Sequence, residues 1–311
     1  MKPAGIPGTI IGVATNIAEQ IDTGAPSGWP PLLRRVHTAL ACPACHADLA
    51  CKPDAVTCLR CHERYPVHDG KIYFIESMTP GDALDSIKRR LKKLLGGAYY
   101  SLGIRIIAPT YPFNFRKAIR RHGRPERALV IDLGSGNNRL DDDIIAVDAV
   151  DYDAVDIVAD LARLPFKSDS IDVFASRSVM EHLPNLASAV RELTRCTRSG
   201  GFGVHLIPFL FPYHASPHDY QRLTHSGAAT LFPGWEIVEQ RNATGPATLF
   251  VVCLAEFLAI VFSLGRERLK APAYLLACLV LFPLKFLDAP FVGRKAFLGL
   301  APTILTVARK P

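Results

Sequence analysis

The stretch Ala128-Leu-Val-Ile-Asp-Leu-Gly-Ser-Gly-Asn137 decides how the rest of this 311-residue chain is interpreted. An apolar run that stops at a glycine turn is typical of a buried parallel strand leading into a helix. A dinucleotide-binding G-x-G-x-x-G is excluded, because Arg139 stands at the third glycine position. What remains is an acid, Asp132, two residues before Gly-x-Gly. Its carboxylate can accept hydrogen bonds from a ligand ammonium group, while the glycines leave room for the ligand.

The segment 141–148, in which four apolar residues precede Asp148, predicts a second buried strand that ends in an acid. Ligands of doubly wound sheets bind beyond the carboxyl ends of the strands. An acid at that place accepts the two hydroxyls of a ribose well, so we predict this role for Asp148, with Asp151 and Asp153 as solvated-loop alternatives. Only residues 137–143 separate the glycines from this strand, which predicts a very short first helix.

These motifs, in this order, resemble class I S-adenosylmethionine (SAM) methyltransferases of the type 11-like group. The resemblance rests on the D-x-G-x-G turn, on the segment Val155–Phe166 and on Arg177–Pro184, and it covers roughly residues 128–242 plus the final strand. It implies an α/β fold with a doubly wound, seven-stranded, Rossmann-like sheet. It also implies a SAM site at Asp132, Gly134, Ser135, Gly136, Asp148, Asp160, Leu161 and Ser176. By resemblance, the Asp160 carboxylate faces the adenine amino group and the Leu161 amide faces a ring nitrogen. The pair Glu181-His182 borders the transfer site in that family, although a structural role is equally open.

A polar and aromatic loop, residues 208–224, follows the predicted fifth strand, where an acceptor substrate has to enter. Methyl transfer from a sulfonium is an in-line displacement, so the enzyme mainly positions the acceptor and excludes water. A hydroxyl acceptor also needs a base, and histidine suits neutral pH. We therefore predict His214 and His218 as candidate bases and Asp219 as the group that orients one of them. Helix capping and loop packing are the structural alternative for these residues.

Four cysteines near the N-terminus have the spacing of a zinc ribbon: C-x2-C, twelve residues, then C-x2-C. Cys42, Cys45, Cys58 and Cys61 are predicted to close a tetrahedral structural zinc site that has no open position for chemistry. The continuation predicts two strands joined at Asp69-Gly70. From about Leu40 to Glu76 the chain resembles the zinc-ribbon domain that activates tRNA and release-factor methyltransferases. Fused in front of a methyltransferase, this module is predicted to act as an internal scaffold or substrate platform.

Positive charge is concentrated between the ribbon and the glycine turn. The chain has a net charge of +7, and residues 88–127 hold twelve Lys or Arg against one acid. Residues 82–95 predict a basic amphipathic helix, which can lie on an anionic membrane or contact phosphates. A linker helix packed by its leucines is the plain alternative. Few aromatic residues interleave the charges, so a nucleic-acid partner is possible but unsupported.

Two apolar runs, 246–264 and 271–284, lie between the predicted sixth and seventh strands. The first approaches spanning length and the second is short. A spanning hairpin would put the basic residues between the runs on the far side of the membrane, against the positive-inside tendency. We therefore predict a shallow membrane hairpin or a hydrophobic lid, with membrane contact through 245–290; a dimer interface or a buried helix pair is the alternative.

The predicted organisation has four parts. They are a flexible leader (1–36), a zinc-ribbon domain (37–79), a basic helical linker (80–127) and a methyltransferase domain (128–311) that contains an apolar helical insertion (243–300). The Gly/Pro-rich start has no convincing signal peptide. Four of the eight cysteines follow a metal pattern, which indicates a reducing compartment. The predicted location is cytoplasmic, peripheral at the inner face of the membrane.

The predicted function is SAM-dependent methylation of a membrane-proximal small molecule, lipid or glycan. An RNA or translation-factor methyltransferase is one alternative, and its binding would weaken steeply with salt. A non-catalytic scaffold protein on the same fold is another, and it would bind no SAM. No motif identifies the acceptor atom.

Overall fold

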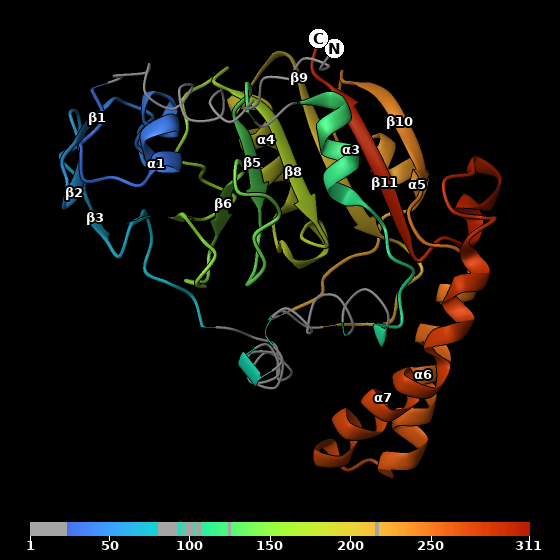
Figure 1. Cartoon of the computed structure of the whole chain (residues 1–311). Helices are drawn as coiled ribbons and strands as arrows, with labels where there is room; N and C mark the ends of the chain where they lie inside the picture. Colours follow the sequence, from blue (N-terminus) through green and yellow to red (C-terminus); the bar gives the residue numbers. More distant parts are fainter. Residues whose placement is uncertain are drawn as a thin grey trace, which may run out of the picture.

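The computed structural model describes residues 24–79, 93, 94, 96, 103, 107–123, 126–214 and 218–311 (Figure 1). The strands are β1 (Leu49–Cys51), β2 (Ala55–Cys58), β3 (Arg64–His68), β4 (Lys71–Tyr73), β5 (Val130–Leu133), β6 (Ile145–Asp148), β7 (Ile157–Val158), β8 (Ile171–Arg177), β9 (Thr197–Pro208), β10 (Glu236–Asn242) and β11 (Thr303–Arg309). The helices are α1 (Pro31–Val36), α3 (Phe115–His122), α4 (Leu186–Cys196), α5 (His225–Ala229), α6 (Pro246–Ser263) and α7 (Glu267–Leu281). Short 3₁₀ turns are η1 (His37–Ala39), η3 (Met180–His182), η4 (Phe282–Asp288) and η5 (Lys295–Leu300).

The predicted seven-stranded, Rossmann-like sheet is confirmed. Its strands follow the order β7-β6-β5-β8-β9-β11-β10. The first five are parallel, and β11 runs antiparallel to both of its neighbours. The carboxyl ends of β5, β6 and β7 therefore meet at one edge of the sheet, where the predicted cofactor residues follow them.

The N-terminal ribbon extends this sheet instead of forming a separate body. Strands β1 to β4 continue the order beyond β7, so that one sheet contains eleven strands. The joint is a parallel pairing of β4 with β7, in which Ile72 lies opposite Ile157. A second joint pairs Leu40 with Phe166. The predicted turn between β3 and β4 is present, with Asp69 at φ 52° and Gly70 at φ 73°, as a tight hairpin requires.

Apolar side chains cover both faces of the sheet. On one face, α3 packs with Phe115 and Ile119 against strand residues such as Val130. On the other face, α4, α1 and the ribbon share a single core, to which Leu193, Leu33 and Val56 belong. Figure 1 shows α3 in front of the sheet and α4 behind it.

Part of the predicted flexible leader is ordered. Residues 1–23 lie outside the described residues, but α1 begins at Pro31 and buries Leu33 and Val36 completely. Trp29 is also buried and donates to the Lys52 carbonyl at 3.2 Å. Since these apolar side chains fill the shared core, the Gly/Pro-rich composition did not prevent order here. The predicted basic helix over 82–95 lies outside the described residues, apart from 93 and 94.

Much of the positive charge of α3 is paired within the fold. Arg120 lies 2.7 Å from Asp141, and Arg116 lies 3.5 Å from the same carboxylate. Arg121 lies 3.8 Å from Glu239. These pairs reduce the charge that this helix offers to a phosphate backbone.

Between β5 and β6, within the fully described stretch 126–214, the chain forms turns and no helix. The sequence predicted a very short helix there. Arg139 holds these turns in place, because its guanidinium contacts both carboxylate oxygens of Asp156, at 2.7 and 3.0 Å. It also donates to the Ile144 and Ala154 carbonyls. The residue that excluded a dinucleotide motif thus has a structural role.

The apolar insertion forms a helical hairpin, α6 and α7, that projects away from the sheet (Figure 1). Asp288 anchors its base, since the buried carboxylate accepts hydrogen bonds from the amides of Gly245, Ala247 and Thr248 at the start of α6. Among the described residues, two helical segments are long and apolar enough to cross a membrane, Pro246–Ser263 and Arg268–Asp288. Large apolar side chains on both helices face outward, including Phe257 and Phe262.

Candidate functional site

The glycine turn after β5 has the geometry of a ligand-binding loop. Gly134 and Gly136 both adopt left-handed conformations, at φ 59° and 61°. A Cβ on Gly134 would come within 2.6 Å of Val179, so the turn needs glycine for its close packing on the segment after β8. At Gly136, by contrast, an added Cβ would meet nothing within 4 Å. The buried Ser135 hydroxyl has no hydrogen-bond partner in the part of the chain that the structure describes.

Two of the predicted acids stand at the adjacent strand ends. Asp148 ends β6, and its carboxylate accepts hydrogen bonds from the Gly136 amide at 2.8 Å and the Val150 amide at 2.9 Å. Asp160 follows β7 and accepts from the Ala162 amide at 2.9 Å. Backbone donors therefore fix both carboxylates at the edge of the sheet where β6 and β7 end, and Asp148 contacts the glycine turn. Leu161, whose amide was predicted to face adenine, has a buried side chain.

The alternative ribose acid Asp151 has a different position. Its carboxylate binds Lys71 of β4 and accepts a hydrogen bond from the Tyr73 hydroxyl at 3.0 Å. It therefore joins the ribbon to the loop after β6. Asp153 is exposed. Of the three acids considered, only Asp148 contacts the glycine turn.

Asp132 is the most deeply buried of the three predicted cofactor acids. Only 3% of its surface is exposed. Burial raises the pKa of its carboxyl to about 7, although the positive charge of Arg177 opposes this effect. A ligand cation beside this carboxylate would favour the ionised form. The group is thus suited to bind an ammonium group at neutral pH.

Ser176, near the end of β8, contacts a histidine inside the sheet. Its side chain is fully buried, and its hydroxyl lies 2.8 Å from Nδ1 of His205 on the neighbouring strand β9. Burial lowers the pKa of His205 to about 3, so the imidazole is neutral. The Ser176 hydroxyl therefore has a structural role inside the sheet, and the predicted place of this residue in the cofactor site stays a prediction.

On the acceptor side, the structure brings His214 and Asp219 together. The His214 amide donates to Asp219 at 3.0 Å, and its ring Nδ1 lies 3.6 Å from the same carboxylate oxygen. Arg222 forms a two-pronged ion pair with Asp219. Burial tends to raise the pKa of Asp219, but the Arg222 hydrogen bonds hold it below its usual value. Asp219 therefore stays ionised and can orient His214, as predicted.

His218 lies apart from this group. Its side chain is exposed, and its ring stands 5.7 Å from that of Tyr220. Only its backbone carbonyl reaches the site, 2.6 Å from Nδ1 of His182. Of the two candidate bases, His214 is the one that Asp219 contacts, and its ring lies 5.0 Å from that of His182.

Glu181 and His182, which the sequence left undecided, complete the acceptor-side cluster. Nε2 of His182 lies 3.6 Å from the Glu181 carboxylate, and Nε2 of His214 lies 3.4 Å from it. The loop after β9 is clamped onto η3, because the Tyr220 amide donates to the Glu181 carbonyl and Gln221 donates to the Met180 carbonyl. The cluster follows Val179, which packs on Gly134, so it borders the glycine turn.

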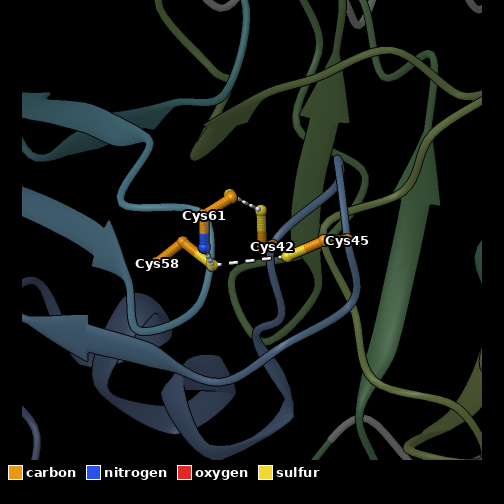
Figure 2. A group of neighbouring side chains, drawn as sticks. All are labelled: Cys42, Cys45, Cys58 and Cys61. Atoms are coloured by element: carbon orange, nitrogen blue, oxygen red, sulfur yellow. Dashed lines mark hydrogen bonds between the residues drawn. The ribbon is translucent and has the colours of Figure 1, made fainter.

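The four ribbon cysteines converge on one point (Figure 2). The sulfurs of Cys42 and Cys61 lie 3.6 Å apart, and those of Cys45 and Cys58 lie 3.5 Å apart. Zinc–sulfur bonds of about 2.3 Å in a tetrahedron place the sulfurs roughly 3.8 Å apart. The four side chains therefore fit a zinc ion.

The two cysteine pairs share a local conformation. The residue after each pair, His46 and His62, is left-handed, at φ 58° and 61°. This conformation folds each pair into a tight turn. Although burial alone raises the pKa of Cys58, hydrogen bonds from the Cys61 and Arg60 amides lower it well below the usual thiol value. A thiolate is the form that binds metal.

Comparison with known proteins finds one family similar to part of the chain. Residues 115–204, from α3 into β9, match the family model described as a methyltransferase domain. This part of the chain is therefore similar to a methyltransferase domain, and the sheet that contains it is Rossmann-like. No curated protein sequence shows significant similarity to the chain.

Solved structures of low identity resemble the chain. A complex of the Haloferax volcanii Trm112 methyltransferase activator with a putative methyltransferase is 16% identical, with a TM-score of 0.41, and the match covers 76% of this chain and 100% of that one. A Haemonchus contortus phosphoethanolamine N-methyltransferase 2 with bound S-adenosyl-L-methionine is 14% identical, with a TM-score of 0.45, and the match covers 80% and 62%. A putative methyltransferase from Bacillus halodurans is 16% identical, with a TM-score of 0.36, and the match covers 63% and 98%. At these scores the likenesses assign no substrate or partner to this chain.

Proposed function

We propose that the chain binds SAM and transfers its methyl group to a membrane-proximal small molecule, lipid or glycan. The observation that carries the first part is that three acids, Asp132, Asp148 and Asp160, stand at or just beyond the carboxyl ends of three neighbouring parallel strands, with Asp148 bound to the Gly136 amide. Asp132 faces the ammonium group of SAM, Asp148 the ribose hydroxyls and Asp160 the adenine. Each of these three contacts pairs a polar group of SAM with a carboxylate whose position the fold sets.

On the acceptor side, residues from two elements border the glycine turn. His214 is held by Asp219, and both lie in the loop that follows β9. In the proposed reaction the acceptor lone pair displaces the thioether, and the methyl carbon moves from sulfur to the acceptor. The chain aligns the two reactants and excludes water. If the acceptor is a hydroxyl, His214 accepts its proton.

Calorimetric titration tests cofactor binding. Wild-type protein is expected to bind one SAM per chain. Asp148→Ala removes the carboxylate that accepts from the ribose hydroxyls and from the turn amide, so we expect SAM affinity to fall by at least about tenfold, equal to one lost charged hydrogen bond. Asp153→Ala, an exposed acid of the following loop, is the matched control and should bind as wild type. Normal SAM binding by Asp148→Ala would contradict the ribose assignment, and no binding by the wild type would remove the proposed function.

The hairpin supports the membrane-proximal part of the proposal. Two apolar helices project from the sheet, with exposed phenylalanines on α6 and exposed aliphatic side chains on α7. The basic residue Arg266 stands at the turn between them, and Lys270, in the first turn of α7, pairs with Glu256 at 2.6 Å. Outward apolar side chains next to basic ones suit the boundary between acyl chains and anionic headgroups. An acceptor held in that boundary would be delivered near the domain that modifies it.

Vesicle sedimentation tests this contact. The wild-type protein is expected to pellet with vesicles of mixed neutral and anionic phospholipid. Phe257 and Phe262 are 60% and 68% exposed, and burial of each contributes about 2 kcal/mol. The double change Phe257→Ser with Phe262→Ser should therefore weaken binding at least tenfold. Leu59→Ser is the control, because this ribbon leucine is similarly exposed, at 62%. Equal sedimentation of all three proteins, or none, would refute the membrane contact.

A further inference from the structure

The strongest unassigned feature is the buried carboxylate of Glu181. Its side chain is 1% exposed, and neither carboxylate oxygen has a hydrogen-bond partner among the described residues. An ionised carboxylate away from water is costly unless a cation or several donors balance it. The nearest groups are the ring nitrogens of His182 and His214, at 3.6 and 3.4 Å. Neither contact has hydrogen-bond geometry in this structure.

We propose that Glu181, His182 and His214 bind a divalent transition-metal ion on the acceptor side of the glycine turn. The ligand atoms of the three residues all lie within 4.8 Å of one another. Metal–ligand bonds of about 2.1 Å in a tetrahedron place neighbouring ligand atoms roughly 3.4 Å apart. The two measured Glu–His separations are close to that value, so an ion fits between them with small side-chain shifts.

The groups behind the two histidines also fit a metal site. Ligating histidines usually hold the other ring nitrogen against a carboxylate or a carbonyl. Here Nδ1 of His182 lies 2.6 Å from the His218 carbonyl. Nδ1 of His214 lies 3.4 Å from the Pro212 carbonyl and 3.6 Å from the Asp219 carboxylate. The guanidinium of Arg222, which pairs with Asp219, lies 3.4 Å from the same Nδ1 atom. Both Nε2 atoms are therefore turned toward Glu181, which is the arrangement in which they can bind metal.

The nature of the ligands indicates the ion and what it can hold. Two imidazoles and one carboxylate suit zinc, iron, manganese or cobalt, and three protein ligands leave at least one position open. An oxygen-donor group of the acceptor, or water, is the ligand that this position would take. A bound ion would occupy Nε2 of His214, and it would replace this histidine as the group that promotes loss of a proton from an acceptor hydroxyl. The inference about the acceptor rests on the proposed function, whereas binding of the ion itself does not.

Metal analysis of the full-length chain, purified with Zn²⁺ present, tests the site. Wild-type protein is expected to hold two zinc ions per chain, one in the ribbon and one at Glu181. Glu181→Gln and His214→Gln should each hold one. The exposed His225, on α5, provides the matched control, and His225→Gln should hold two. The folded fraction of each variant is selected by size-exclusion chromatography and circular dichroism before the measurement.

Cobalt spectroscopy identifies which ion is lost. Co²⁺ bound by four thiolates gives strong sulfur-to-metal charge-transfer absorption, which a site of two histidines and a carboxylate lacks. His214→Gln should retain the charge-transfer and d–d bands of the four-thiolate site and lose only the weaker d–d absorption that the second cobalt ion adds. One zinc ion per wild-type chain, or unchanged metal content in both variants, would overturn the proposal. SAM binding is measured separately, so failure of the metal site and failure of the methyltransferase assignment give different results.

Discussion

Cys58→Ser is expected to release the ribbon zinc and to unfold much more of the chain than the ribbon itself. Cys58 is buried in the same core as Leu33, Ile72 and Phe174. Strand β4 also continues the sheet through β7. In isolated zinc fingers the metal contributes about 10 kcal/mol to folding, whereas whole domains are stable by only about 5–15 kcal/mol. We expect a loss of at least about 5 kcal/mol in the free energy of unfolding.

The measurement combines zinc content with thermal unfolding followed by circular dichroism. Cys51→Ser is the matched control, because Cys51 lies in β1 outside the four-cysteine cluster. It should retain zinc and unfold near the wild-type temperature. If Cys58→Ser keeps its zinc, the assignment of the site is wrong. If it loses zinc while the methyltransferase sheet unfolds at the wild-type temperature, the shared core does not couple the two parts.

The sequence predicted the strands that carry the cofactor residues, because buried parallel strands leave a clear signal. The run ending at Leu133 is apolar apart from Asp132, and the glycines after it could be recognised by spacing alone. The four cysteines were equally clear, since a metal imposes a fixed spacing. In both cases a local pattern is sufficient to define the site.

Contacts between distant segments could not be predicted in the same way. Trp29 and Leu33 lie in a stretch whose Gly and Pro content resembles a linker, but the ribbon and the sheet together provide a core for them. Ser176 shows the opposite case. The family pattern suggested a cofactor contact, but the neighbouring strand brings His205 against its hydroxyl.

The acceptor-side cluster combines a local sequence pattern with a contact between distant segments. The Glu181-His182 pair and His214 are separated by β9 in sequence, and only the clamp between η3 and the following loop brings them together. His218 satisfies the same sequence pattern as His214, yet its side chain points to solvent. Sequence could identify the histidines but not choose the pair, because the choice depends on how the loop folds back.

Asp132→Asn is expected to weaken SAM binding strongly and, at the same time, to make the SAM-free protein more stable. In the folded chain burial raises the pKa of Asp132 to about 7, whereas the usual value is 3.8. At pH 8 the ionised group therefore favours the unfolded state, and the difference between the two pKa values corresponds to about 4 kcal/mol. Asparagine has the same shape without the charge, so much of this cost should disappear. The amide cannot balance the SAM ammonium group, so binding should fall at least about 100-fold.

The pH dependence separates this carboxylate from a purely structural one. Only ionised Asp132 attracts the ammonium group, so wild-type SAM affinity should rise with pH up to about 7 and then level off. Below that point it should fall by up to about tenfold per pH unit. The stability benefit of Asp132→Asn should follow the opposite course: it is absent below about pH 4, grows as pH rises and is complete above about pH 7. Asp142→Asn, at an exposed acid of the turn before β6, is the matched control and should change neither quantity. A destabilised Asp132→Asn would mean that the fold itself pairs this carboxylate. An unchanged SAM affinity would mean that the cofactor ammonium group binds elsewhere.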